Sequence, residues 1–253
     1  MNRLEIKRLC KTLHIKAGDN LMIHGDIGAI HQFNYNKTQN IKKKLKTFYK
    51  NLKKEISNNG NILIPTFTYN FCKKKFVNLD RDNSEVGIFS ELTRQLKKGR
   101  QTSHPIFSFK IFGNKYKYFE NSDQNTCFGS GSLFDRFRKI NGKIVFLGCE
   151  FNRMTFIHFI EEAYKVNYRY IKKFEGKIKF NKKIKKVNVE YFVQKSNFKK
   201  KLNLDALYDL MSKYKKIRSF ELGKYNVILV KTNDIEKYAL KGLKKNINFL
   251  VKK

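Results

Sequence analysis

The segment at residues 155–169, TFIHFIEEAYKVNYR, places one histidine and two glutamates in an otherwise apolar and aromatic run. In a helix, His158 and Glu161 lie three residues apart and therefore share a face, with Glu162 beside them. A histidine oriented by a carboxylate can remove a proton from an amine near neutral pH. The alternative is a core histidine that merely has a carboxylate neighbour, and the surrounding elements have to decide between the two.

The elements that would position this pair alternate between strands and helices. A helix is expected over 1–20, a strand that opens into a glycine loop over 20–30, and a basic amphipathic helix over about 36–58. The apolar strand ILIPTFTY follows, then a helix near 87–98 and the buried strand KIVFLGCEF at 143–151. This order predicts an α/β fold with a largely parallel sheet. The last strand leads directly into the histidine segment, and open α/β sheets bind ligands at the carboxyl ends of their strands.

The C-terminal part has a different pattern. The segments EGKIKF (175–180) and KKVNVEYFVQ (185–194) alternate with a period of two, which predicts an antiparallel hairpin with one solvated face. A helix, a second hairpin around ELGKYNVILVKT and a closing basic helix are expected after it. We interpret residues 1–253 as a single domain with its core motifs in about 18–176 and an added β-rich portion in 177–253.

Composition limits the class of protein. With 41% hydrophobic and 14% aromatic residues, the chain can bury a core, and no run is long enough to span a membrane. The N-terminus has no apolar stretch typical of a signal peptide, and the four cysteines are scattered, so a cytoplasmic protein is expected. The formal charge of +34 indicates either a polyanionic partner or compositional drift towards lysine. No zinc-ligand spacing and no nucleic-acid-binding motif is present, so we expect no metal and no dedicated nucleic-acid partner.

Three weaker features also point to a shaped, anion-binding site. Pro65 and Pro105 fix two strand-to-loop junctions beside hydroxyl-bearing residues. Seven of the ten arginines fall between residues 81 and 169, although drift would favour lysine, and arginine suits the recognition of phosphate or carboxylate. The glycine–hydroxyl segment CFGSGSLF (127–134) could present backbone N–H groups to an anion, although it is not a P-loop.

Taken together, these segments resemble the aminoglycoside 3-N-acetyltransferase family, also called the antibiotic N-acetyltransferase family. The resemblance runs from about residue 18 to 176, through GDNLMIHGDIGAI, ILIPTFTY, LDRDNSEVGIFSELTR, GRQTSHPIFSFKIFG, CFGSGSLFDR, IVFLGC and TFIHFIEEAYKVNYR. It implies a layered α-β-α fold that is distinct from the GNAT fold. It also implies acetyl-CoA or another acyl-CoA as donor and the amine of a sugar as acceptor.

The resemblance also assigns roles to residues. The family's His-x-x-Glu dyad falls on His158 and Glu161, which implies that these two residues are catalytic, by direct transfer without an acyl-enzyme. The implied donor-binding residues are His24, Gly25, Asp26, Ile27, Arg100, Ser103, His104, Ser108, Gly129 and Ser130. The acceptor-binding residues expected with them are Thr66, Thr68, Tyr69, Asp80, Glu162 and Arg169. One departure stands out, because the family's usual His-Ser-Ser-Leu loop reads His-Gly-Asp-Ile here and so lacks two hydroxyls near the thioester.

The acceptor is predicted from charge. Aminoglycosides are polycations, whereas a nucleotide-linked amino sugar carries a pyrophosphate that a strongly basic surface would attract. We therefore expect a nucleotide-linked amino sugar of surface-glycan synthesis as the acceptor, with an aminoglycoside as the alternative. A non-catalytic polyanion-binding protein on the same scaffold is a further alternative, and a homodimer is possible.

Overall fold

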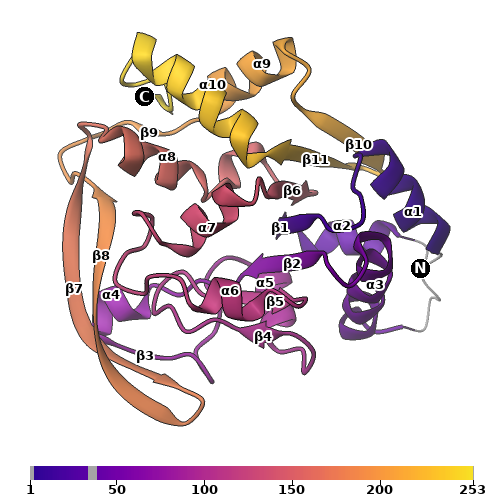
Figure 1. Cartoon of the computed structure of the whole chain (residues 1–253), viewed down its shortest axis with the longest axis horizontal. Coiled ribbons are helices and arrows are strands. Elements are labelled where there is room, and N and C mark those ends of the chain that lie inside the picture. Colours follow the sequence, from indigo (N-terminus) through magenta and orange to yellow (C-terminus); the bar gives the residue numbers. More distant parts are fainter. Residues whose placement is uncertain (1–2, 34–38, 253) are drawn as a thin grey trace.

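The computed structural model describes residues 3–33 and 39–252. Its centre is a mixed sheet in the strand order β10-β11-β6-β1-β2-β5-β4, with helices on both faces (Figure 1). The strands are β1 (Asn20–Gly25), β2 (Asn61–Pro65), β4 (Arg100–Gln101), β5 (Phe109–Phe112), β6 (Lys143–Leu147), β10 (Arg218–Leu222) and β11 (Tyr225–Lys231). Only the neighbouring pairs β6–β1 and β1–β2 of this sheet are parallel, and its other neighbouring pairs are antiparallel. The sheet is therefore less parallel than the sequence pattern predicts.

Alternation along β1 divides the core into two layers. Leu21 and Ile23 point to one face and Met22 to the other, as expected for a strand buried on both sides. Helices α1 (Arg3–Thr12), α2 (Ile27–Gln32), α3 (Ile41–Ile56) and α5 (Ile88–Arg94) cover the first face. The second is covered by α6 (Tyr116–Glu120), α7 (Leu133–Lys139), α8 (Ile157–Tyr164), α9 (Asp205–Lys213) and α10 (Thr232–Lys245). The layered α-β-α architecture predicted from the sequence is confirmed.

A long hairpin forms a second sheet along one side of the molecule (Figure 1). Strands β7 (Arg169–Phe180) and β8 (Lys183–Gln194) pair along their full lengths, and β3 (Phe76–Asn78), which follows α4 (Asn70–Lys74), pairs with β7. A short η1 turn (Phe151–Arg153) precedes α8, and β9 (Lys201–Leu202) pairs with β12 (Val251–Lys252). The hairpin predicted from the period-two alternation is confirmed.

The C-terminal part is integral to the main sheet. Strand β11 pairs antiparallel with β6, in a register that sets Ile228 opposite Phe146. Residues 218–231 thus extend the central sheet beyond β6, and α10 packs on the face of this sheet. The sequence pattern instead predicts residues 177–253 as a portion added to the core. The predicted helix at about 36–58 begins at Ile41, and residues 34–38 lie outside the described part. Among the described helices, none is long and apolar enough to cross a membrane.

Candidate active site

A cavity of 620 Å³ opens at the carboxyl ends of the three parallel strands. This is the edge of the sheet at which the sequence places the site. Its walls come from the end of β1, the segment after β2, the loop before α5, and the stretch between β6 and α8. The lining residues are His24, Gly25, Asp26, Pro65, Phe67, Tyr69, Glu85, Val86, Gly87, Ser90, Cys149, Asn152, Arg153, Met154, Thr155, His158 and Leu202.

His158 lies in the first turn of α8 and lines the cavity. Its Nδ1 is 2.5 Å from Oε2 of Glu161, one turn further along the same helix. The Phe128 ring packs beside the imidazole, with a centroid separation of 5.3 Å. Because Glu161 is ionised and can only accept, Nδ1 carries the proton in this pair. Nε2 is then the ring nitrogen that remains for chemistry in the cavity.

Glu161 is fully buried and has three partners. Besides His158, its Oε1 accepts a hydrogen bond from the Tyr168 hydroxyl at 2.8 Å, and Nε of Arg169 lies 2.8 Å from Oε2. Burial by itself would raise the pKa of Glu161. Attraction to His158, followed by the contacts with Arg169 and Tyr168, outweighs burial and holds this pKa below its usual value. The carboxylate therefore stays charged and fixes the histidine tautomer.

A tight chain reversal supplies two of these partners. Helix α8 ends at Tyr164, and Lys165 adopts the left-handed conformation with φ 55° and ψ 50°. The N–H of Val166 then donates to the carbonyl of Glu161, which satisfies a helix-end acceptor. The chain turns back so that Tyr168 and Arg169, at the start of β7, face Glu161 from outside the helix. The aromatic plane of Tyr168 is itself held by stacking on Phe198 at 4.8 Å.

The corner between β1 and α2 forms the opposite wall. The ring of His24 stacks on Phe146, and burial lowers the pKa of His24 to about 4, so this histidine is neutral at physiological pH. Asp26 caps α2 by accepting from the N–H of Gly28. A Cβ atom on Gly25 would lie 2.8 Å from the Phe89 ring. The aromatic ring therefore occupies the space in which the family's first serine would have its side chain.

Charged groups in the cavity wall include two carboxylates and one guanidinium. Oε1 of Glu85 accepts from the Tyr69 N–H at 2.7 Å and from the Thr68 hydroxyl at 3.0 Å, while Oε2 lies 3.7 Å from Nζ of exposed Lys73. Burial opposes ionisation of Glu85, but these hydrogen bonds and Lys73 lower its pKa overall. Among the lining residues, the carboxylates of Asp26 and Glu85 face one guanidinium, that of Arg153.

Comparison with known proteins decides the family. The family model described as aminoglycoside 3-N-acetyltransferase matches residues 22–244. The chain belongs to the aminoglycoside 3-N-acetyltransferase family. The protein is thus an N-acyltransferase that uses an acyl-CoA donor, as the motifs predicted. A search of curated protein sequences finds no significant match.

Solved structures that share this fold match nearly the whole chain of this acetyltransferase. AAC-IIIb in a binary complex with CoASH has 16% identity and a TM-score of 0.76, with 97% of each chain covered. Sisomicin-bound AAC-VIa has 17% identity and a TM-score of 0.75, covering 97% of this chain and 98% of its own. The YokD protein from Bacillus subtilis has 16% identity and a TM-score of 0.72, covering 96% and 99%. At these identities the likeness shows the shared fold.

The structure brings five of the sequence-predicted site residues to the cavity wall and places Glu161 directly behind it. The five are His24, Gly25, Asp26, Tyr69 and His158. Thr68 does not line the cavity, but its hydroxyl donates a hydrogen bond to Glu85, which does. Arg169 does not line the cavity either, and it contacts Glu161 behind the wall.

Other predicted residues have local contacts that account for their polar groups. Ser103 bonds to Glu120 through both its N–H and its hydroxyl, and Nδ1 of buried His104 accepts from the N–H groups of Ile106 and Phe107. Ser108 donates to the carbonyl of Thr66, whose own hydroxyl contacts Ser108. None of these four is among the residues that line the cavity. Their role as donor or acceptor ligands stays a prediction.

The remaining predicted residues also lie outside the cavity lining. The guanidinium of Arg100 sits 4.1 Å above the Tyr116 ring, and Asp80 accepts from two N–H groups at the tip of the β7–β8 hairpin. Glu162 is half-buried, and burial first, then Glu190, raises its pKa to about 7. Ile27, Gly129 and Ser130 belong to the start of α2 and to the turn before α7.

Sequence reasoning did not assign several residues of the wall. Cys149, Asn152 and Arg153 come directly after β6, and Ser90 lies in α5. The signal was available for the first three, because they follow a buried strand whose carboxyl end was expected to face the site. No spacing in the sequence shows that Ser90 or Leu202 would reach the same cavity.

Replacing Glu161 with Gln tests the buried contacts. We expect a loss of about 3–5 kcal/mol in the free energy of unfolding at pH 7, because the Arg169 guanidinium would be left buried without its counter-charge. The pKa of Glu161 is lowered in the folded protein, so its stabilisation is present above the usual value of about 4.5 and is lost as pH falls through the folded pKa. We therefore expect urea unfolding between pH 7 and pH 3 to show that the difference in the free energy of unfolding between Glu161→Gln and the wild type becomes smaller in acid.

Tyr168→Phe is the control for this experiment. It removes one hydrogen bond to the carboxylate but no charge, so it should cost less, about 1.5–3 kcal/mol. Because Tyr168 makes the smallest of the contributions that lower the pKa of Glu161, its difference from the wild type should shrink in acid much less than that of Glu161→Gln. A loss of stability in Glu161→Gln that does not change with pH would contradict a charged Glu161.

Replacing Gly25 with Ser tests the coupling to Phe89. Restoring this family residue should lower the free energy of unfolding by about 1–3 kcal/mol, because the new Cβ overlaps the buried ring. Thermal unfolding of Gly25→Ser, Phe89→Leu and the double variant forms a cycle. We expect the double variant to be more stable than the sum of the single effects predicts. Simple additivity would show that the ring does not exclude the serine.

Proposed function

We propose that this enzyme transfers an acetyl group from acetyl-CoA to an amino group of an aminoglycoside, with His158 as the base. The single observation that carries the proposal is the pair of His158 and fully buried Glu161 at the wall of the cavity. A histidine whose Nδ1–H is fixed by a charged carboxylate presents an unprotonated Nε2. An imidazole held in that state is the group that amine acylation requires.

The chemical step balances within this arrangement. The acceptor amine attacks the thioester carbonyl, a C–N bond forms, and Nε2 of His158 takes the proton that the nitrogen loses. Collapse of the tetrahedral intermediate breaks the C–S bond, and the proton on His158 is available to the departing CoA thiolate. Glu161 stabilises the transient imidazolium and does not itself need to accept the proton.

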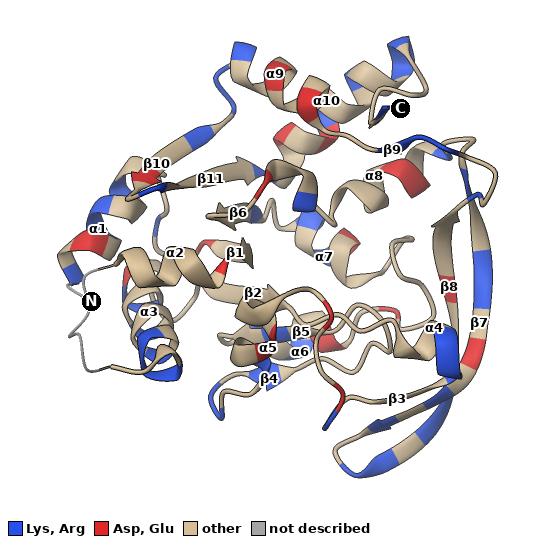
Figure 2. Ribbon diagram, turned by 180° about the vertical axis from the view of Figure 1, so that it is seen from behind, with Lys and Arg blue, Asp and Glu red and all other residues tan. Residues whose placement is uncertain are grey.

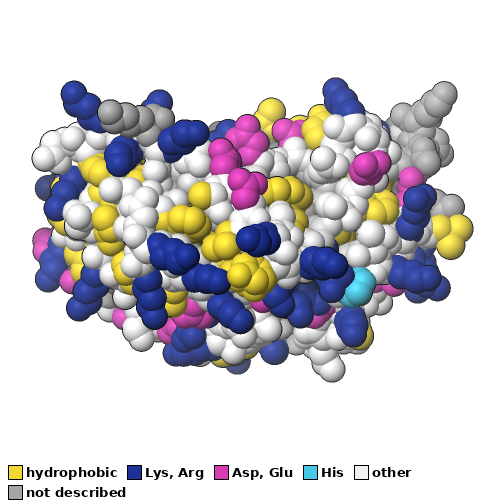
Figure 3. All heavy atoms as spheres, turned by 90° about the horizontal axis from the view of Figure 1, so that it is seen from above, with side chains coloured by type: hydrophobic (Ala, Val, Ile, Leu, Met, Phe, Trp, Pro, Cys, Tyr) yellow, Lys and Arg dark blue, Asp and Glu magenta, His cyan; other side chains and the backbone are white. Residues whose placement is uncertain are grey.

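The cavity charges favour a cationic acceptor. Asp26 and Glu85 line the wall with Arg153 as the opposing cation, although the whole chain carries a formal charge of +34. Lys and Arg residues are spread over α3, the β7–β8 hairpin and the terminal helices (Figure 2). They are likewise scattered over the face seen in Figure 3. Because exposed charges are screened within about 10 Å at 0.1 M salt, the nearby carboxylates dominate recognition of an ammonium group.

This reasoning replaces the expectation of a nucleotide-linked amino sugar, which rested on the overall charge. A pyrophosphate in the cavity would meet the two carboxylates and find one guanidinium in the wall. The family assignment points the same way, and the related AAC-VIa fold has been solved with sisomicin bound. A nucleotide-linked amino sugar is best used as the competing acceptor in the assay.

Replacing His158 with Gln should lower kcat at least about 100-fold, because Gln can fill the space but cannot accept a proton. Release of CoA thiol from acetyl-CoA, with kanamycin, gentamicin or sisomicin as acceptor, measures the rate. Binding of CoA, followed by calorimetry, should stay near the wild-type value. His31→Gln is the matched control, since His31 is exposed and does not line the cavity. Retention of turnover by His158→Gln would remove His158 from the reaction.

Replacing Glu85 with Gln should raise KM for the aminoglycoside about tenfold and leave KM for acetyl-CoA unchanged, because a carboxylate contact to an ammonium is lost. Lys73→Gln is the control. It removes the cation that lies beside Glu85 but keeps the carboxylate, so KM for the aminoglycoside should not rise. If a UDP- or dTDP-linked amino sugar is the better wild-type substrate, and Glu85→Gln improves it, the acceptor assignment is wrong.

A further inference from the structure

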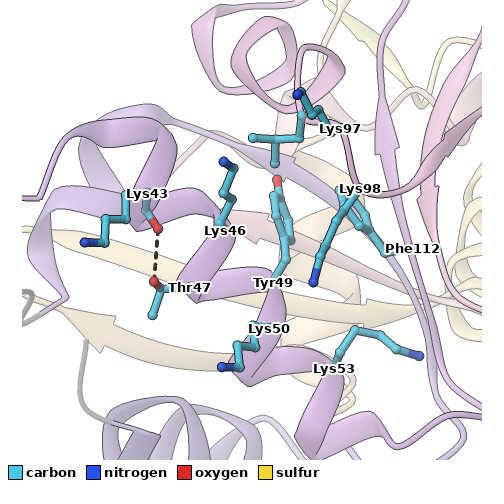
Figure 4. A pocket seen from close by; sticks show the side chains of 10 residues that line it. Lys43, Lys46, Thr47, Tyr49, Lys50, Lys53, Lys97, Lys98 and Phe112 are labelled. Carbon is cyan, nitrogen blue, oxygen red and sulfur yellow. Dashed lines mark hydrogen bonds between the residues drawn. The ribbon is translucent and has the colours of Figure 1, made fainter.

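A second concave site lies between α3 and the segment after α5. We call it the lysine groove, and it has a volume of 580 Å³ (Figure 4). It shares no lining residue with the catalytic cavity. Helix α5 connects the two, since Ser90 lines the cavity whereas Leu96, just beyond the helix, lines the groove. The groove is lined by Lys43, Lys46, Thr47, Tyr49, Lys50, Lys53, Leu96, Lys97, Lys98 and Phe112.

Lysines line this groove from two separate segments, and the side chains of Lys43 and Lys50 point away from the Tyr49 ring (Figure 4). Those of α3 follow one another at steps of three, four and three residues, which places them along the helix at about 4.5–6 Å intervals. The consecutive pair Lys97 and Lys98 forms the other wall (Figure 4). No lining residue is acidic. In the described ranges, no carboxylate forms an ion pair with Lys43, Lys46, Lys50, Lys97 or Lys98.

One lysine of the set is held by the backbone. Nζ of Lys53 donates to the carbonyls of Ser57 and Gly60, at 2.9 and 2.6 Å, and so ties the end of α3 to the turn before β2. The other five have no such partner within the part of the chain that the structure describes. Charges of one sign on both walls repel one another, and an anion between the walls would relieve that repulsion.

The floor of the groove is apolar and rigid. The rings of Tyr49 and Phe112 stack on each other at 4.6 Å with an interplanar angle of 18°, and Leu96 lies beside them. All three residues are buried, so the floor exposes only a small apolar area, most of it at Phe112. The Tyr49 hydroxyl is fixed by a 2.6 Å hydrogen bond to Thr93. Lysine stems add further apolar surface around this floor. A ligand that matches both parts needs several negative charges and a flat apolar group.

We propose that the lysine groove binds a nucleoside polyphosphate, with the phosphates between the two lysine walls and the base against the lysine stems and the exposed edge of the floor. The volume is that of a site for a small organic ligand, so one nucleotide suits it better than a nucleic-acid strand. The site is distinct from the site of acetyl transfer and does not depend on the acceptor proposed above.

Titration calorimetry of the full chain with ADP and ATP tests the proposal. The double variant Lys46→Glu/Lys50→Glu should bind ADP at least about tenfold more weakly, because it reverses two charges of one wall. The control Lys42→Glu/Lys244→Glu makes the same change in net charge with two exposed lysines outside the groove, and it should keep the wild-type affinity. Equal weakening by both pairs would overturn the proposal, because it would show a general charge effect.

Two further measurements separate the alternatives. ADP should bind equally well when the enzyme is saturated with CoA, and KM for acetyl-CoA should be unchanged in Lys46→Glu/Lys50→Glu. A raised KM or competition by CoA would overturn the proposal by making the groove part of the donor site. Tripolyphosphate should bind more weakly than ATP, which has the same number of phosphates, because it lacks a base. Equal or tighter binding of tripolyphosphate would refute the role of the apolar part of the groove.

Discussion

The buried carboxylate of Glu161 is the interaction on which the site depends. A charged group with no exposed surface is stable only when it is paired and hydrogen-bonded, and here His158 and Tyr168 form hydrogen bonds with Glu161 while Arg169 forms an ion pair with it. The three partners come from α8 and from the start of β7. The base is therefore positioned jointly by the helix after β6 and by the hairpin, and neither element could fix it alone.

This constraint explains why the hairpin belongs to the catalytic body although its tip lies far along the side of the molecule (Figure 1). Arg169 opens β7, and its guanidinium also donates to the carbonyl of Phe192 in the paired strand β8 at 3.1 Å. The pairing of β7 with β8 thereby orients Arg169, which in turn stabilises ionised Glu161. A substitution that shifts this part of the hairpin would therefore alter the orientation of His158 through the side chains of Arg169 and Glu161.

The sequence predicts the dyad better than it predicts the rest of the wall. His158 and Glu161 are three residues apart in one helix, so local periodicity is enough to pair them. Tyr168 and Arg169 meet Glu161 only because Lys165 adopts a left-handed conformation, and a lysine gives no local sign of that. Glu85 reaches the wall through hydrogen bonds from Tyr69 and Thr68, sixteen and seventeen residues away, and no period encodes such a contact. The sequence pattern predicts a largely parallel sheet and not the mixed sheet that is observed. The antiparallel pairing of β11 with β6 joins segments some eighty residues apart, and no local pattern indicates it.

The altered loop after β1 shows how a motif can change without loss of shape. A serine at position 25 requires free space next to its Cβ, and Phe89 from α5 fills that space here. In this chain, the absence of a side chain at position 25 and the position of the Phe89 ring are therefore sterically linked. At the next position, Asp26 caps α2 through the N–H of Gly28, as a serine could, but adds a negative charge to the wall. The net result is a cavity that is tighter beside α5 and more acidic at the end of β1. The added carboxylate agrees with the ammonium-bearing acceptor proposed above, within a chain that carries a formal charge of +34.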